Sequence, residues 1–175
     1  MRTTKFILLS FAFLFIQSCC PFLADCDNND DDIIIDPISS RYEPVFIDRN
    51  DFENSVSIND PIAINTSGKI YIKDGLLFIN EVRKGFHIYD NTDPTSPTPI
   101  KFLKAPGSTD LAVRDNMIYI NQATDLIAIA FNTATNEITL TKRVVNVFPE
   151  LRSPDGFLPY NIPENNVVVG WELTN

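Results

Sequence analysis

Short apolar runs separated by turn-forming residues make up most of the chain after Arg41. Gly, Pro, Asn and Asp stand between the runs, and no long stretch repeats its apolar residues at helical spacing. Apolar runs of about four to eight residues bounded by such turns are typical of β-strands. The pattern therefore predicts an all-β domain over residues 41–175.

One block of this pattern occurs twice. Residues 72–80 (IKDGLLFIN) align with residues 113–121 (VRDNMIYIN) at an offset of 41, and residues 85–90 align with residues 125–130 at an offset of 40. A period of about 40 to 45 residues with four short strands per unit is typical of β-propeller blades. We therefore predict a partial β-propeller with two four-stranded units. The two units are residues 69–108 and 109–149.

Each unit is expected to begin with a tight hairpin. Asp74-Gly75 and Asp115-Asn116 are pairs that tolerate the positive φ angles of such turns. The second strand of each hairpin, Leu76–Ile79 or Met117–Ile120, is mostly apolar at successive positions. A strand with apolar residues at successive positions is expected to be buried on both faces.

The last strand of each unit, Ile100–Lys104 or Ile138–Lys142, mixes polar and apolar residues, as an outer edge does. Residues 41–65 predict a strand and a short helix begun by Asp48, and residues 167–171 predict a terminal strand. A closed propeller needs at least about four blades. With two units, open blade faces are expected, through which the chain associates with itself or with a partner.

The first residues have the features of an export signal. A short basic stretch precedes the apolar run Phe6–Ile16, which is too short to span a bilayer stably. Residues 16–19 (Ile-Gln-Ser-Cys) look like a lipobox, in which the chain is cut before a lipid-bearing cysteine. We expect a lipoprotein signal peptide over residues 1–18 and lipidation of Cys19. An ordinary secretory signal, with Cys19 incidental, is the alternative.

Residues 19–40 predict an acidic tether that cannot bury itself. Acidic residues soon after Cys19 resemble the surface-export signal of Bacteroidota lipoproteins, which implies display at the outer membrane. An EF-hand calcium loop starting at Asp27 is disfavoured. Asp32 and Ile38 stand where that loop needs glycine and glutamate.

The formal net charge of −9 limits the classes of partner. Polyanions are repelled, and no basic patch with interleaved aromatic residues is present in the sequence, so nucleic acid is not expected as a partner. An acidic membrane surface is equally unattractive without a covalent anchor. Membrane attachment is therefore expected through the lipid on Cys19, because buried acyl chains supply the binding energy. A disulfide between Cys20 and Cys26 would close only a small loop within the tether.

Several ordered blocks between residues 41 and 149 point to one family. They are Tyr42–Val45, Gly68–Ile72, Phe78–Glu81, Gly85–Pro94, Pro106-Gly107, Asp110–Val113 and Asp125-Leu126. Together they resemble bacterial surface lipoproteins with LVIVD-type β-propeller repeats. The second repeat departs from the pattern at Ala130 and Ala134, where the first has Asp90 and Pro94. The resemblance implies a propeller and a surface location, and it supplies no catalytic residues.

Few side chains suit chemistry. His87 is the only histidine, and its place in an apolar strand predicts a half-buried structural side chain. The sequence holds no phosphate-binding loop, zinc-spaced cluster or serine nucleophile motif, and no cofactor is expected. Asp90 and Asp93 are close enough in sequence to bind calcium. The alternative is that both carboxylates cap the turn before Pro94.

Two further groups are candidates for ligand binding. Glu81 and Asp110 lie near predicted loop ends, and a pair of carboxylates at a suitable distance would serve glycan hydrolysis. Trp171, Tyr160 and Phe157 are candidates for an aromatic sugar platform or for a terminal core cluster. The sequence favours a lipid-anchored module that binds a protein, a glycan or another envelope component without catalysis. The alternatives are a carboxylate-based glycan hydrolase and a shortened fragment of a larger propeller protein.

Overall fold

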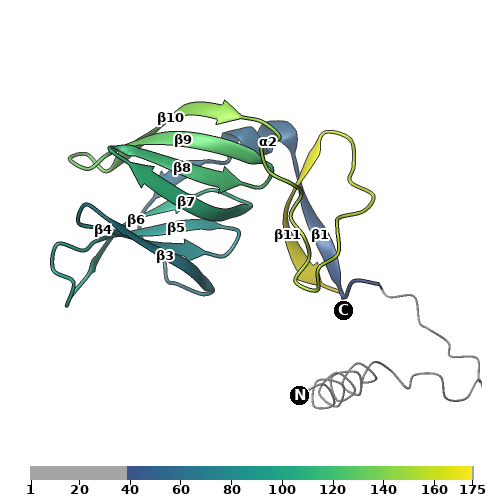
Figure 1. Ribbon diagram of the computed structural model, residues 1–175, viewed down its shortest axis with the longest axis horizontal. Coiled ribbons are helices and arrows are strands. Elements are labelled where there is room, and N and C mark those ends of the chain that lie inside the picture. Colours follow the sequence, from purple (N-terminus) through teal and green to yellow (C-terminus); the bar gives the residue numbers. More distant parts are fainter. Residues whose placement is uncertain (1–38, 175) are drawn as a thin grey trace, which may run out of the picture. The chain divides into compact units, whose positions relative to one another are not determined.

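Eleven β-strands and one short helix make up residues 39–174, the part of the chain that this computed structural model describes (Figure 1). The elements are β1 (Tyr42–Asp48), α2 (Arg49–Asn54), β2 (Ser57–Asn59), β3 (Ser67–Lys73), β4 (Leu76–Glu81), β5 (Gly85–Asp90), β6 (Thr98–Lys104), β7 (Ser108–Arg114), β8 (Met117–Gln122), β9 (Asp125–Asn132), β10 (Glu137–Val144) and β11 (Asn166–Leu173). The predicted all-β class is confirmed. The expected signal peptide, Cys19 and residues 20–38 of the tether lie outside the described residues.

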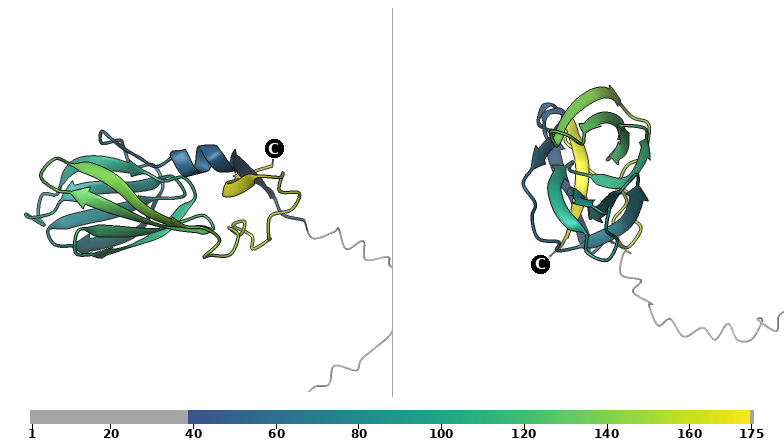
Figure 2. Two further views of the ribbon diagram at one scale, coloured as in Figure 1. Left: turned by 90° about the horizontal axis from the view of Figure 1, so that it is seen from above. Right: turned by 90° about the vertical axis from the view of Figure 1, so that its left-hand side faces the viewer.

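The strands form three antiparallel sheets. The first sheet has the order β2-β6-β5-β4-β3, the second has the order β10-β9-β8-β7, and the third pairs β1 with β11. The first and second sheets stack face to face, with β3 next to β7 at one edge and β2 next to β10 at the other (Figure 2). Each of these two sheets contains one predicted repeat as four consecutive antiparallel strands.

Two-residue turns join the first two strands of each repeat, as the sequence predicts. Asp74 and Gly75 both have positive φ angles, 51° and 76°, so the turn between β3 and β4 needs residues that tolerate this conformation. In the second repeat Asp115 alone of the pair has a positive φ angle, 52°. The turn residues therefore fix both hairpins locally.

The main core lies between the first and second sheets. Its members are Phe78, Phe86, Ile88, Leu103, Leu111, Ile118, Ile120, Ile127, Ile129 and Phe131. No helix of the described residues has the length and hydropathy that a membrane crossing requires.

Equivalent positions of the two repeats face opposite ways relative to this core. Phe78 of the first sheet points into the core and is 1% exposed, whereas its equivalent Tyr119 points outward and is 36% exposed. One position further along, Ile120 is fully buried and its equivalent Ile79 is only half-buried. The two sheets therefore stack head to tail, like successive units of a repeat array, and are not related by a two-fold axis.

Two expectations about the strands were wrong. The strands Leu76–Ile79 and Met117–Ile120 bury one face well and the other only partly, because a single neighbouring sheet covers each of them. The strand Ile100–Lys104 is not an edge, because Ser57–Asn59 pairs with it and adds a fifth strand to the first sheet. Ile138–Lys142, in contrast, does lie in the edge strand β10.

The predicted strand, helix and terminal strand that flank the repeats are confirmed. Asp48 ends β1 and caps α2, since its Oδ1 accepts the backbone N–H of Asn50 at 2.8 Å. Phe52 of α2 is buried in a second, smaller core with Ala123 and Val167. The first and last described strands, β1 and β11, pair along their whole length.

We predict that alanine substitutions at two equivalent positions of the repeats, Leu111 and Ile70, destabilise the protein by different amounts. Leu111→Ala should lower the free energy of unfolding by about 2–5 kcal/mol, because Leu111 is 8% exposed and the change leaves a cavity. The matched change Ile70→Ala should cost about 0.5 kcal/mol or less, because Ile70 is 63% exposed. Urea unfolding of dilute protein measures both, and equal losses would contradict the head-to-tail arrangement.

Candidate functional site

The buried carboxylate of Asp125, the first residue of β9, joins three segments of the chain. Its Oδ2 accepts hydrogen bonds from Arg49 Nη2 at 2.6 Å and from Arg143 Nη1 at 2.8 Å. Its Oδ1 accepts the backbone N–H of Asn146 at 3.2 Å. Both guanidinium groups also lie over the ring of Phe52, 5.4 Å and 5.1 Å from its centroid. This network holds α2 against the end of the second sheet.

Burial by itself would raise the pKa of Asp125, but the hydrogen bonds from Arg49 and Arg143 outweigh burial and hold the pKa below its usual value. The carboxylate therefore stays ionised at neutral pH. Two guanidinium groups and one backbone N–H compensate its charge, which a buried carboxylate requires.

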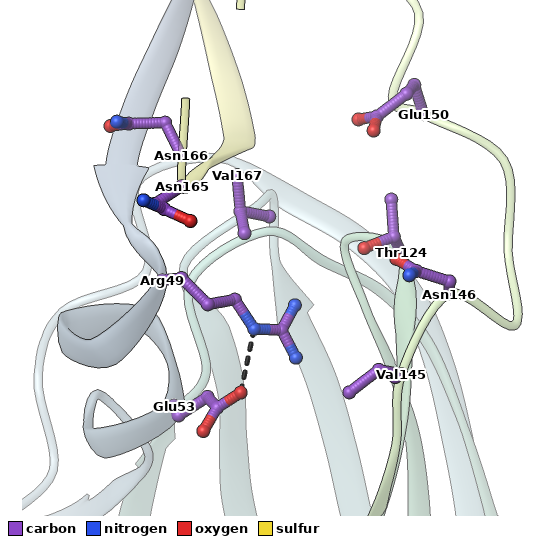
Figure 3. A pocket seen from close by; sticks show the side chains of 9 residues that line it. All are labelled: Arg49, Glu53, Thr124, Val145, Asn146, Glu150, Asn165, Asn166 and Val167. Atoms are coloured by element: carbon purple, nitrogen blue, oxygen red, sulfur yellow. Dashed lines mark hydrogen bonds and ion pairs between the residues drawn. The ribbon is translucent and has the colours of Figure 1, made fainter. Parts of the chain in front are cut away.

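A pocket of about 290 Å³ opens beside this network (Figure 3). Its lining comes from α2, the turn before β9, the connection after β10 and the start of β11. The lining residues are Arg49, Glu53, Thr124, Val145, Asn146, Glu150, Asn165, Asn166 and Val167. We call this site the Glu150 pocket. Most of its lining is polar, with side-chain amides, two glutamates and one guanidinium.

Two glutamates stand on opposite sides of the Glu150 pocket, as Figure 3 shows. Glu53 is held by Arg49, whose Nε lies 2.7 Å from Glu53 Oε1. Glu150 Oε2 is buried and has no hydrogen-bond partner within the described residues. Burial raises the pKa of Glu150. Its carboxyl therefore keeps its proton to a higher pH than an exposed glutamate, and in that form it both donates and accepts hydrogen bonds.

Sequence reasoning missed this pocket, because its residues come from four separate segments. Glu150 lies in the irregular stretch between β10 and β11, where the spacing of residues gives no periodic signal. The pair Asn165-Asn166 ahead of the predicted terminal strand is the one local hint, since adjacent amides in a loop suit hydrogen bonding to ligands.

Glu81 and His87 form a buried pair at the end of the first sheet. His87 Nε2 lies 3.0 Å from Glu81 Oε2, and Glu81 also accepts the backbone N–H groups of Asn65 and Thr66. Burial would raise the pKa of Glu81, but its hydrogen bonds, the one with His87 foremost, lower it. The structural role expected of His87 is confirmed, and its side chain is fully rather than half-buried.

Glu81 and Asp110, the two carboxylates considered for glycan hydrolysis, have separate partners in the structure. Glu81 is bonded to His87 and to the backbone of residues 65–66, whereas Asp110 is exposed and bonded to Lys69 of the neighbouring sheet. A glycosidase acid needs a raised pKa and access to a substrate, and Glu81 has neither.

Asp90 and Asp93 are exposed and cap turns of their own segment. Asp90 Oδ1 accepts the N–H of Thr92 at 2.9 Å, and Asp93 Oδ1 accepts the N–H of Thr95 at 3.0 Å. These hydrogen bonds lower the pKa of both carboxyls. Within residues 39–174 no group of three or more His, Cys, Asp or Glu side chains is arranged to hold a metal ion. Calcium binding at Asp90 and Asp93 stays a prediction.

The three aromatic residues proposed as a sugar platform lie in the terminal region. Trp171 is on β11, and its indole N–H donates to the carbonyl oxygen of Leu151 at 3.0 Å. Phe157 is half-buried and Tyr160 is 52% exposed. Because the Trp171 N–H is already engaged with the backbone, this side chain ties the irregular segment to the terminal strand.

Comparisons with models of protein families, with curated proteins and with solved structures found no match. The likeness to LVIVD-type lipoproteins therefore depends on the residues of this chain alone.

We predict that Asp125→Asn lowers the free energy of unfolding by about 3–5 kcal/mol, because it removes a fully buried carboxylate that pairs with two partly buried guanidinium groups. The matched change Asp110→Asn, at an exposed ion pair, should cost about 1 kcal/mol or less. Urea unfolding at neutral pH measures both changes, and losses of equal size would contradict the role given to Asp125.

The lowered pKa of Asp125 predicts how the stability of the fold changes with pH. The pKa of Asp125 is lower in the folded than in the unfolded state, so its stabilisation is fully present above the unfolded value of about 3.9. The stabilisation is lost as the pH falls through the folded value. In Asp125→Asn the urea midpoint should therefore fall less steeply below about pH 4 than in the unchanged protein. Identical slopes for the two proteins would count against this assignment.

Proposed function

We propose that this chain is a lipid-anchored module of the bacterial cell envelope, built as a shortened β-propeller, that binds a hydroxyl-rich ligand of the glycan class in the Glu150 pocket. The 41-residue repeat and the head-to-tail stacking of its two meanders support the propeller interpretation. The likeness to LVIVD-type surface lipoproteins supports the cellular location.

The main support for a hydroxyl-rich ligand is the carboxyl group of Glu150. This carboxyl has one buried oxygen without a partner, and it lines a pocket with the amides of Asn146, Asn165 and Asn166. Amide groups offer both donors and acceptors, and carboxyl oxygens accept hydrogen bonds. A sugar hydroxyl both donates and accepts, so it can pair with each of these groups. The guanidinium of Arg49 adds donors for ring or hydroxyl oxygens.

The size and charge of the site narrow the ligand class. A volume of about 290 Å³ is at the lower end of the range for small-molecule sites, roughly 300–1,000 Å³, and suits a short sugar unit. The net charge of −9 disfavours polyanionic ligands. We therefore propose a neutral glycan, bound without a cofactor.

Glycan hydrolysis is a second candidate, because Glu53 and Glu150 face each other across the pocket. A carboxyl with a raised pKa opposite a second carboxyl group is the pair that most glycosidases use. The ion pair between Glu53 and Arg49 argues for binding instead, because it engages the carboxylate that would have to attack or activate water.

We predict that residues 39–175 bind neutral glycans on an array of immobilised oligosaccharides. Glu150→Gln, which keeps a hydrogen-bonding group of the same shape, should retain binding to the glycans selected by the unchanged protein. Glu150→Leu should weaken that binding about tenfold or more, since loss of one hydrogen-bond partner costs about 1–3 kcal/mol.

Two controls make this test decisive. Glu137→Leu changes an exposed glutamate that does not line the pocket, and it should bind as the unchanged protein does. If the unchanged protein released reducing sugar from the bound glycan and Glu150→Gln abolished this release, the protein would be a glycan hydrolase and the proposal of binding without catalysis would be refuted. Absence of binding to every neutral glycan on the array would refute the proposed ligand class.

We predict that Cys19 carries the lipid anchor. In bacteria expressing the full chain and fed an alkyne-labelled palmitate, the protein should be labelled and should sediment with the membranes. Cys19→Ser should abolish both properties, whereas Cys20→Ser should leave them unchanged. Labelling that survives Cys19→Ser would refute the assignment of the lipid to this residue.

A further inference from the structure

We propose that copies of this chain assemble head to tail, with the outer face of the first sheet in one copy packed against the outer face of the second sheet in the next. This assembly rests on the head-to-tail stacking of the two repeats, and it does not depend on ligand binding in the Glu150 pocket.

The outer face of the first sheet, which we call the isoleucine face, is built like a packing surface. Ile70 and Ile72 of β3 are 63% and 61% exposed. Leu77 and Ile79 of β4 and Tyr89 of β5 are half-buried on the same face. An apolar sheet face of this kind marks an interaction site in a folded protein.

The repeat shows what such a face packs against. The equivalents of Ile70, Ile72, Leu77 and Ile79 in the second repeat are Leu111, Val113, Ile118 and Ile120, and all four contribute to the main core. They pack there against the inner face of the first sheet. The isoleucine face therefore fits a surface that is equivalent to that inner face.

The outer face of the second sheet, which we call the alanine face, is that equivalent surface. Tyr119 occupies the position of Phe78, Leu126 that of Phe86 and Ala128 that of Ile88. A shallow hollow lies over Ala112, Tyr119, Leu126 and Phe148. Alanines stand where the inner face has large side chains, so the bulky isoleucines of another copy have room to pack there.

The charges at the edge where β3 and β7 lie side by side are also complementary. Lys69 and Asp110 are equivalent positions, and within one chain they form an ion pair between β3 and β7. The same stacking between copies brings Asp110 of one copy next to Lys69 of the next. Because the two contacting faces differ, a pair of copies still has one free face at each end. Further copies can therefore add until the assembly is a closed ring or an open chain.

Sedimentation equilibrium of residues 39–175 over a range of concentrations tests the assembly. This segment contains none of the chain's three cysteines, so disulfides cannot link the copies. We expect a mass of two or more copies for the unchanged segment. Ile72→Glu, on the isoleucine face, and Tyr119→Glu, on the alanine face, should each raise the concentration for half-assembly about tenfold or more, because each puts a charge into an apolar contact.

A mixture of the two variants is the decisive measurement. Each variant keeps the face that the other has lost, so an equal mixture should form a complex of two copies at a concentration at which each variant alone is monomeric. Leu158→Glu adds the same charge to an exposed leucine outside both faces, and it should assemble as the unchanged segment does. Circular dichroism and thermal unfolding establish that all three variants are folded.

The remaining outcomes overturn the proposal. A monomeric mass for the folded, unchanged segment at every concentration would show that a second copy does not occupy these faces. Assembly that only one variant disrupts, with no complex in the mixture, would show a symmetric dimer instead. Glu150→Leu should leave assembly unchanged, so failure of glycan binding and failure of assembly are distinguishable.

Discussion

Each β-sheet has two faces to cover, and the two stacked repeat sheets of this chain have four faces between them. The interface around Phe78, Ile118 and Ile120 covers two of these faces. Because the repeats stack head to tail, the two remaining faces differ, one with exposed isoleucines and one with alanines. A two-fold arrangement would have left two copies of the same face. The direction of stacking therefore determines which surfaces the molecule presents.

The ends of the same two sheets hold the segments that precede the repeats. Glu81 and Gln122 are equivalent residues, and both are buried. Glu81 accepts backbone N–H groups of the segment before β3, and the Gln122 amide donates to Ser55 Oγ, directly after α2, at 3.3 Å. The same position of each repeat thus binds a segment that lies outside that repeat's four strands. The Glu150 pocket exists because Asp125, at the same end of the second sheet, also fixes α2 there.

Local features of the fold could be predicted from the sequence, and features that depend on distant residues could not. The turn at Asp74-Gly75 and the cap at Asp48 follow from the chemistry of adjacent residues, and the repeat follows from comparing the chain with itself. The pairing of β2 with β6 could not be predicted, because β2 has only three residues and is too short to give a recognisable strand pattern. Partial exposure of Ile79 depends on whether another sheet lies above it. The pocket joins Arg49 to Asn165, and no local signal connects two residues so far apart.

The pairing of β1 with β11 has a consequence for how the molecule folds. The backbone N–H of Thr174 donates to the carbonyl of Arg41 at 2.9 Å, so this pairing closes a loop that contains nearly the whole described unit. Closing a long loop costs more entropy than closing a hairpin, and such contacts form slowly. The meanders of the repeats can form while the chain is still being synthesised, whereas the last strand joins afterwards. Since Asn165, Asn166 and Val167 line the Glu150 pocket at the start of that strand, the pocket is completed in the final step.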